Sequence, residues 1–242
     1  FDGVEALRNC SFIVKEKSIT ALIGPNGAGK TTVFNIISGL VKQDSGNITL
    51  KNISLKNLNI HQRANQGISR TFQLVRLFPK LSVMENLLLA FPKINEGFFA
   101  SLIKRKPIKK QEKTARLRCH AVLENIGLKE KAYELAADLS YGQQKLVELA
   151  RCFIGESDIL LLDEPVAGVN PVLREKIKTI LKQIQKNGKT ILLIEHDMKF
   201  VLDIADEIIV LNYGEEIAFG SPHDIKNNPK VLEAYLGERI KP

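Results

Sequence analysis

The sequence lacks several features that would place the chain in other classes of protein. Its three cysteines, an odd number without paired spacing, do not make a disulfide framework and suit a reducing cytosol. No uninterrupted apolar run approaches the roughly 20 residues that a membrane-spanning helix needs. The chain shows no signal-peptide pattern and begins at Phe1 rather than at methionine, so we expect a few residues to precede it in the full protein.

Positive charge is concentrated in one segment. The net charge of the chain is +8, and the segment from Lys104 to Arg118 carries eight lysine or arginine residues against one acid, Glu112, a net charge of +7. A nucleic-acid interface would spread basic residues more widely along the chain, so no nucleic-acid partner is expected. Two interpretations of the segment stay open: a solvated helix face, or a patch that lies beside anionic lipid headgroups.

Short apolar runs alternate with helical patterns, which predicts βα units and a mostly parallel sheet. Continuous apolar runs at 18–24, 158–165 and 190–197 are typical of strands that are buried on both faces. The segment 206–220 predicts two short antiparallel strands around a turn at 212–214. These patterns together favour an α/β fold.

The middle of the chain has a different pattern. Ser82 and Glu85 have the spacing of a capping box at the start of an apolar helix. A second helical stripe, which includes Cys119 and Leu123, ends at Gly127. No convincing strand is predicted between residues 74 and 153, so we expect a helical insertion there.

The run GPNGAGKT, residues 24–31, matches the phosphate-binding pattern G-x-x-x-x-G-K-[ST]. It follows a predicted strand and opens a predicted helix. Its glycines let the backbone wrap closely round phosphate oxygens, and the helix N-terminus supplies positive potential. Lys30 is expected to reach the β- and γ-phosphates, and Thr31 to bind Mg²⁺. The predicted nucleotide-binding residues of this loop are Asn26, Gly27, Ala28, Gly29, Lys30, Thr31 and Thr32.

Two further apolar runs end in polar side chains. Asp163 is placed to hold Mg²⁺, and Glu164 could accept a proton from an attacking water. His196 ends the other run. Because open α/β sheets bind ligands at the carboxyl ends of their strands, we expect all three residues in one catalytic site. The alternatives are that Glu164 is an ordinary loop carboxylate and His196 a structural histidine.

The sequence therefore predicts an α/β fold with a P-loop NTPase core, a mostly parallel sheet, an antiparallel β portion and an inserted α-helical subdomain. The nucleotide-binding core is expected to comprise residues 1–73 and 154–242. The helical subdomain is expected to comprise residues 74–153.

With these motifs in order, the chain resembles the ATP-binding subunits of ABC transporters over essentially its whole length. The resemblance is carried by GPNGAGKT, ILLLDEP (159–165), LSYGQQ (139–144) and IEHD (194–197). It implies ATP and Mg²⁺ as cofactors and a dimer in which each LSYGQQ segment covers the ATP bound by the opposite subunit. The signature residues implied to act in this way are Ser140, Tyr141, Gly142 and Gln143.

The resemblance implies further site residues. Gln73, in the run RTFQ, would touch Mg²⁺ and the attacking water, and would sense the membrane partner. Phe1, 23 residues before Gly24, would stack on adenine. The run AGVNP, with Gly168 and Asn170, would cross the dimer interface. The implied catalytic residues are Glu164, His196 and Gln73, and the implied Mg²⁺ ligands are Thr31, Gln73 and Asp163.

Finer features resemble one subgroup, the branched-chain amino-acid importers. The segments that carry this likeness are RTFQLVRLFPKLSVMENLLLA, the basic insertion after it, YGQQ, AGVNP and the tail VLEAYLGE. Tyr141 and Asn170 depart from the commonest ABC pattern, which has glycine and aspartate there. The subgroup tolerates both. Lipopolysaccharide-export ATPases, which also carry YGQQ, are an alternative, as are non-transport ABC ATPases.

The importer resemblance implies a set of partners and a location. The partners would be a second ATP-binding subunit, in a homodimer or a heterodimer, and integral membrane permease subunits. An extracytoplasmic substrate-binding protein is also expected. The chain would lie as a peripheral protein on the cytoplasmic face of the inner membrane.

Overall fold

The computed structural model describes residues 5–71, 77–91 and 105–236, and for residues 105–111 it describes the backbone alone. The chain divides into two compact units. The first comprises residues 1–70, 157–167 and 181–242, and the second comprises residues 71–156 and 168–180. The expected boundaries of the core and of the helical subdomain stay a prediction.

The first unit is built on a six-stranded sheet with the strand order β4-β5-β6-β1-β7-β8. Every neighbouring pair is parallel except β7 and β8, which are antiparallel. This confirms the predicted mostly parallel sheet with an antiparallel portion. The strands are β1 (Ile19–Ile23), β4 (Ile68–Arg70), β5 (Ile159–Asp163), β6 (Thr190–Ile194), β7 (Glu207–Asn212) and β8 (Glu215–Gly220).

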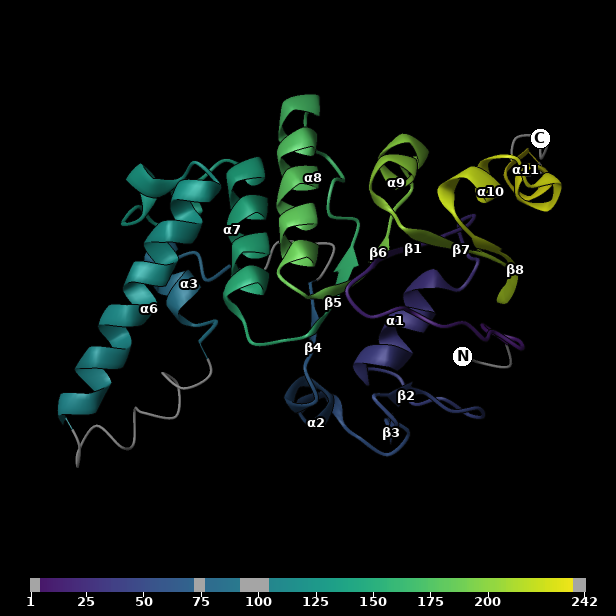
Figure 1. Ribbon diagram of the computed structural model, residues 1–242, viewed down its shortest axis with the longest axis horizontal. Helices are drawn as coiled ribbons and strands as arrows, with labels where there is room; N and C mark the ends of the chain where they lie inside the picture. Colours follow the sequence, from purple (N-terminus) through teal and green to yellow (C-terminus); the bar gives the residue numbers. More distant parts are fainter. Residues whose placement is uncertain (1–4, 72–76, 92–104, 237–242) are drawn as a thin grey trace. The chain divides into compact units, whose positions relative to one another are not determined.

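The continuous apolar runs form strands because both faces of the sheet are covered. Every residue of β1 and β6 is buried. Helix α1 (Lys30–Ser38) lies on one side of the sheet and helix α9 (Met198–Ile204) on the other (Figure 1). Phe34 of α1 is fully buried in a cluster with Leu22 and Leu161, so α1 packs an apolar side chain against the sheet.

The remaining elements of the first unit are short. A separate antiparallel pair, β2 (Thr49–Leu50) and β3 (Ile53–Ser54), was not predicted from the sequence. Helix α2 (Ile60–Asn65) precedes β4, and helices α10 (Pro222–Lys226) and α11 (Pro229–Leu236) follow β8.

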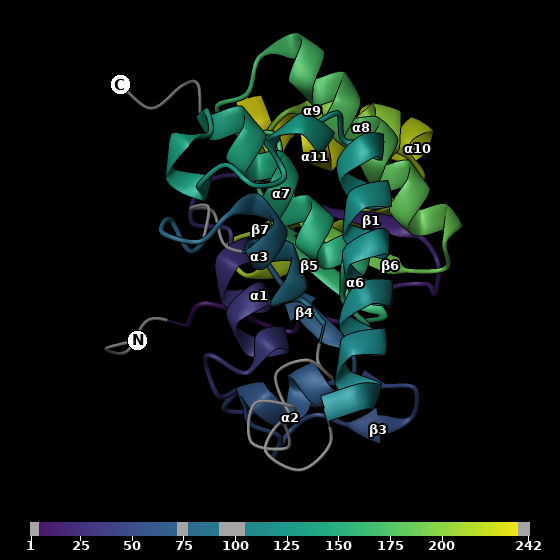
Figure 2. The ribbon, with the colours of Figure 1, turned by 90° about the vertical axis from the view of Figure 1, so that its left-hand side faces the viewer.

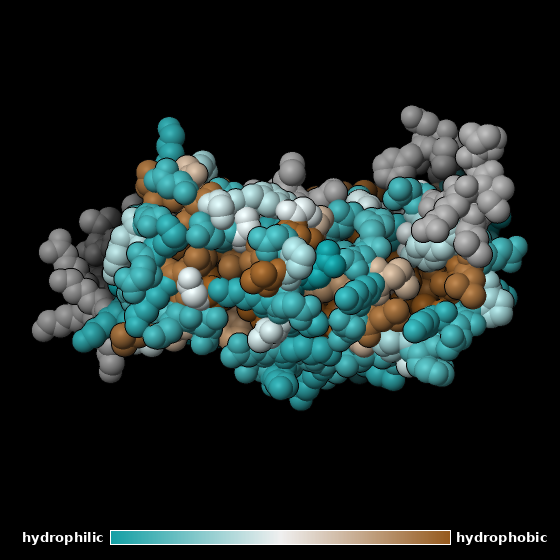
Figure 3. All heavy atoms as spheres, turned by 90° about the horizontal axis from the view of Figure 1, so that it is seen from above, coloured by the Kyte–Doolittle hydropathy of each residue, from teal (hydrophilic) through white to brown (hydrophobic). Residues whose placement is uncertain are grey.

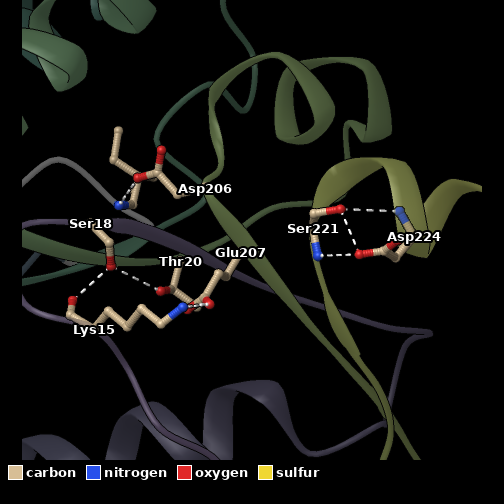
Figure 4. A network of polar contacts seen from close by, with 8 residues as sticks. Lys15, Ser18, Thr20, Asp206, Glu207, Ser221 and Asp224 are labelled. Atoms are coloured by element: carbon tan, nitrogen blue, oxygen red, sulfur yellow. Dashed lines mark hydrogen bonds and ion pairs between the residues drawn. The ribbon is translucent and has the colours of Figure 1, made fainter.

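Side-chain interactions stabilise the edge of the sheet at which the parallel strands begin, called here its amino-terminal edge. Asp206 accepts a hydrogen bond from the backbone N–H of Ile19 at 2.8 Å, and Lys15 pairs with Glu207 (Figure 4). The Ser18 hydroxyl donates to the carbonyl of Lys15 at 2.7 Å. This edge is opposite the carboxyl ends of the parallel strands, where the predicted site residues lie.

The second unit is helical. Helices α3 (Val83–Leu88), α6 (Arg105–Asn125) and α7 (Tyr141–Ile154) contact one another (Figure 2). Two 3₁₀ turns, η1 (Lys129–Lys131) and η2 (Ala136–Asp138), connect α6 to α7. Helix α8 (Pro171–Lys186) contributes residues to both units. The described part of the second unit contains helices and a single β-bridge, between Ser82 and Leu135. This agrees with the predicted helical insertion.

Local sequence explains how these helices begin and what they bury. The Ser82 backbone N–H donates to Glu85 Oε2 at 2.7 Å, which confirms the predicted capping box at the start of α3. Cys119 and Leu123 of α6 are fully buried, as the predicted apolar stripe requires.

Within the ranges that the structure describes, no helix combines the length and the apolar composition needed to cross a membrane. On the face seen in Figure 3, hydrophobic areas are separated by hydrophilic atoms. The three cysteines are free thiols, and Cys119 and Cys152 are buried.

Candidate active site

The phosphate-binding loop has a backbone that requires glycine. Gly24 has φ +147°, and a Cβ placed on it would lie 2.1 Å from the carbonyl oxygen of Leu211 in β7. Gly29, at φ +100°, caps the N-terminus of α1. Glycine has no side-chain oxygen that could accept hydrogen bonds from the first backbone N–H groups of α1. These N–H groups can therefore donate to an acceptor outside the helix, and a phosphate oxygen suits them.

Lys30 and the neighbouring turn brace this loop. The Lys30 ammonium group is buried and donates to the carbonyl oxygens of Gly24 at 2.6 Å and Pro25 at 2.7 Å. The backbone N–H of Gly214, in the turn between β7 and β8, donates to the carbonyl oxygen of Ala28 at 3.1 Å. The loop is therefore tied to β7 and its turn.

A pocket of about 490 Å³ lies over the loop. This volume falls in the usual range of small-molecule sites. Glu164 and His196 line it together with all seven predicted residues of the phosphate loop, so three separate sequence motifs meet there. The remaining lining residues are Glu5, Ala6, Ile194 and Tyr213.

Glu164 and His196 contact each other at the ends of adjacent strands. Glu164 Oε1 lies 2.9 Å from His196 Nε2. The Glu164 backbone has φ +49°, in the left-handed region that non-glycine residues rarely occupy, and its N–H donates to the carbonyl oxygen of Ile194 at 3.0 Å. Such strained residues cluster at functional sites. This geometry suits a carboxylate and an imidazole that act on one bound molecule.

Asp163, one residue earlier at the end of β5, lies in a buried polar network. Its Oδ2 is 3.3 Å from Arg70 Nη2, and the two side chains are only 11% and 8% exposed. Arg70 also donates to Asn35 Oδ1 at 2.7 Å and to Ser38 Oγ at 3.1 Å, both on α1. Burial raises the pKa of the Asp163 carboxyl, while the positive charge of Arg70 opposes that rise.

The oxygen atoms available here fit Mg²⁺ that is bound together with a nucleotide. Thr31 lines the pocket. Asp163 is not among the lining residues, but it directly precedes Glu164, which is. Hydroxyl, carboxylate and phosphate oxygens are the ligands that Mg²⁺ prefers. Among the described residues no cluster of three or more histidine, cysteine, aspartate or glutamate side chains would hold a metal ion.

The LSYGQQ segment forms the N-terminus of α7 in the second unit. Ser140 is the N-cap: its backbone N–H donates to Gln143 Oε1 at 3.0 Å, and its hydroxyl oxygen accepts from the Gln143 N–H at 3.4 Å. A Cβ on Gly142 would lie 2.4 Å from the Leu173 side chain of α8. A side chain at position 142 would therefore require the end of the Leu173 side chain to move, a contact that the sequence did not reveal.

The expected interface loop contacts the same helix. The Tyr141 ring lies 3.5 Å from the position that a Cβ would take on Gly168, which has φ +71°. Lys145 Nζ lies 5.7 Å from the centroid of the Tyr141 ring, within cation–π range. Asn170 Oδ1 accepts from the Leu173 N–H at 2.9 Å and so caps α8. Asn170 therefore supplies the capping oxygen that an aspartate would otherwise supply.

Two predicted site residues, Phe1 and Gln73, lie outside the described residues. Several other residues at or near the site were missed from the sequence, among them the lining residues Glu5, Ala6 and Ile194. Tyr213 lines the pocket from the turn between β7 and β8, and Arg70 and Glu195 are polar residues at the ends of β4 and β6. A charged residue directly after a continuous apolar run was the available signal for Glu195.

Comparison with protein families gives two matches. A family model described as ABC transporter matches residues 7–167. A second model, described as branched-chain amino acid ATP-binding cassette transporter, matches residues 215–241. The two matches lie in succession along the chain and cover most of it.

Curated relatives are similar over nearly the full length. The chain is 45% identical to the high-affinity branched-chain amino acid transport ATP-binding protein LivG of Salmonella typhimurium, over 98% of this chain and 94% of the relative. It is 42% identical to the corresponding protein BraF of Pseudomonas aeruginosa, with the same coverage.

Solved structures of ATP-binding cassettes have the same fold as this chain. An ATP-binding cassette of an ABC transporter in its ADP conformation superposes with a TM-score of 0.83 at 34% identity, over 98% of this chain and 94% of that chain. A dimeric cassette in a post-hydrolysis state, bound to ADP and phosphate, superposes with a TM-score of 0.74 at 28% identity, over 90% and 91% of the two chains.

Proposed function

Since the chain belongs to the ABC transporter family of ATP-binding cassettes, we propose that it is the ATP-hydrolysing subunit of an importer of branched-chain, hydrophobic amino acids. The observation that carries the proposal is the single pocket that brings the phosphate loop, Glu164 and His196 together. The match of residues 215–241 to the branched-chain amino acid model supports the choice of substrate.

The chemistry assigned to the site is transfer of the γ-phosphoryl group of ATP to water. The loop amides and Lys30 bind the phosphates, and they stabilise the charge that develops on the γ-phosphate. Glu164 accepts a proton from the attacking water, and His196 orients the γ-phosphate and that water. Gln73 takes part in positioning the water, and Phe1 stacks on adenine.

Thr31, Asp163 and Gln73 are the proposed ligands of Mg²⁺. When bound, the ion neutralises charge on the β- and γ-phosphate oxygens. Thr31 and Asp163 offer the hard oxygen donors that suit it. Two observations support these two ligands: Thr31 lines the pocket, and Asp163 is the residue directly before Glu164.

A second ATP-binding subunit completes the site. Ser140, Tyr141, Gly142 and Gln143 form the start of α7, whose positive end suits a γ-phosphate held by the partner. Gly168 and Asn170 lie in the loop assigned to the interface between the subunits. A dimer of this kind would close on two ATP molecules and separate after hydrolysis.

The remaining partners are integral membrane permease subunits and an extracytoplasmic substrate-binding protein. The chain is assigned to the cytoplasmic face of the inner membrane as a peripheral subunit. Closing and opening of the dimer would be transmitted to the permease through a contact near Gln73. The relatives LivG and BraF, which are named as transport ATP-binding proteins, support this assembly.

The catalytic assignment is tested with Glu164→Gln. We expect the variant to bind ATP as wild type does and to lose at least about 100-fold in kcat, because general-base catalysis contributes factors of that size. Glu156→Gln, at an exposed position after α7, is the matched control and should keep the wild-type rate. Hydrolysis by Glu164→Gln at the wild-type rate would remove Glu164 from the mechanism.

The substrate is tested by isolating the chain with its membrane subunits. Reconstituted vesicles should take up leucine, isoleucine and valine in an ATP-dependent way, and Lys30→Ala should abolish the uptake. Co-purification with a lipopolysaccharide-export permease, or with ribosomes or DNA, would contradict the importer assignment.

A further inference from the structure

Glu195 is a buried carboxylate that the proposed chemistry does not use. It follows β6, directly before His196, and only 3% of its surface is exposed. A buried carboxylate is costly unless hydrogen bonds satisfy its oxygens. The partners of Glu195 therefore identify what it stabilises.

Among the described residues, its hydrogen-bond partners are backbone N–H groups of the two loops that carry Glu164 and His196. Glu195 Oε1 accepts from Val166, two residues after Glu164, at 2.9 Å. Oε2 accepts from His196 at 3.1 Å, and the backbone N–H of Asp197 also donates to this carboxylate. One side chain thus links the end of β5 to the end of β6.

Burial and hydrogen bonding act on this carboxyl in opposite directions. Burial raises the pKa of Glu195, whereas the three backbone N–H groups lower it by favouring the charged form. A carboxylate that accepts several backbone N–H groups is held firmly because charge-assisted hydrogen bonds are the stronger kind. Glu195 can therefore order both loops.

We propose that Glu195 is a positioning residue that fixes Glu164 and His196 relative to each other. Glu164 has a left-handed backbone, which persists only where its surroundings hold it, and its contact with His196 spans 2.9 Å. The bond from Val166 to Glu195 anchors the loop just after Glu164. The bonds from His196 and Asp197 anchor the other loop. This inference rests on the proposed function for its effect on hydrolysis, but not for the ordering of the loops.

The test is Glu195→Gln, which keeps the shape of the side chain but replaces one acceptor oxygen with a donor. We expect kcat for ATP hydrolysis to fall at least about tenfold while the Kd for ADP changes less than about twofold, because the phosphate loop is untouched. The matched control is Glu207→Gln, at the amino-terminal edge of the same sheet, where Glu207 pairs with Lys15. The control should keep both values.

A second readout is amide hydrogen exchange, which needs no catalytic activity. In wild type, the Val166 and His196 amides should exchange at least about 100-fold more slowly than in an unstructured peptide. In Glu195→Gln they should exchange at least about tenfold faster than in wild type. Should the variant not fold, the wild-type protection alone decides: unprotected amides would overturn the proposal.

The two readouts separate the possible failures. An inactive wild type would contradict the proposed function, and the exchange data would still decide on the ordering of the loops. An active wild type whose Glu195→Gln variant keeps its kcat would overturn the positioning role. So would an equal loss in kcat and in ADP affinity, because that pattern indicates general damage to the fold.

Discussion

At the scale of single residues, the phosphate loop shows why a motif demands glycine at one position more than at another. A Cβ on Gly24 would meet the Leu211 carbonyl oxygen at 2.1 Å, and this oxygen belongs to the backbone of a buried central strand. It cannot move without shifting β7. At Gly27 nothing lies within 4 Å of the same added atom, so only the φ of +78° disfavours a side chain.

This difference predicts unequal effects of the same substitution. Gly24→Ala should lower the free energy of unfolding by more than about 3 kcal/mol, because the new methyl group overlaps the strand backbone. Gly27→Ala should cost about 1–2 kcal/mol, the penalty for a left-handed alanine. Urea denaturation followed by circular dichroism measures both values, and equal losses would contradict the packing argument.

The glycine of the signature segment serves two requirements at once. Within its unit, Gly142 packs closely against α8, because a Cβ would lie 2.4 Å from the end of the Leu173 side chain. In the proposed dimer it also leaves room for a phosphate at the end of α7. The contact with Leu173 involves the far end of a flexible side chain, so the packing requirement is weaker than the one at Gly24.

At the scale of secondary-structure elements, Arg70 joins three of them. From the end of β4 it reaches Asn35 and Ser38 on α1 and Asp163 on β5. Its guanidinium also lies 5.6 Å from the centroid of the Phe34 ring. The helix that begins at the phosphate loop is thereby tied to the strand that ends in the carboxylates.

We predict that Arg70→Met lowers the free energy of unfolding by about 3–5 kcal/mol, because it leaves a buried carboxylate without its cation. Thermal and urea denaturation without nucleotide measure the effect. Lys51→Met is the matched control: Lys51 pairs with Asp158, just before β5, but both side chains are more than half exposed. It should produce no measurable change, and a large loss there would contradict the argument from burial.

The elements differ in how far the sequence predicts them. The strands β1, β5 and β6 appear as continuous apolar runs because helices cover both faces of the sheet. Ser82 and Ser140 mark the starts of helices because their side chains cap the helix N-termini locally. By contrast, β2 and β3 contain two residues each and exist only through their pairing. The roles of Arg70 and Glu195 depend on which strands become neighbours, and no local pattern encodes that order.

At the scale of the whole molecule, the proposed site is divided between two chains. In the proposed function the pocket residues would bind the phosphates from one side, and the start of α7 in the partner subunit would cover them from the other. One of the similar solved structures is a dimeric cassette bound to ADP and phosphate. Dimerisation should therefore require bound ATP. The dimer should persist when the cassette carries a substitution that prevents hydrolysis of that ATP.

We predict that Glu164→Gln is monomeric without nucleotide and forms a homodimer with ATP and Mg²⁺, as measured by sedimentation velocity. Adding Ser140→Arg should abolish the dimer and leave ATP binding by the monomer unchanged, because the bulky cation blocks only the surface presented to the partner. Leu117→Arg, at an exposed position of α6, is the control and should still dimerise. Loss of monomer ATP binding in the Ser140 variant would mean that α7 acts within its own chain. A Glu164→Gln protein that binds ATP but stays monomeric would exclude the homodimer and leave a heterodimer with a second ATP-binding subunit.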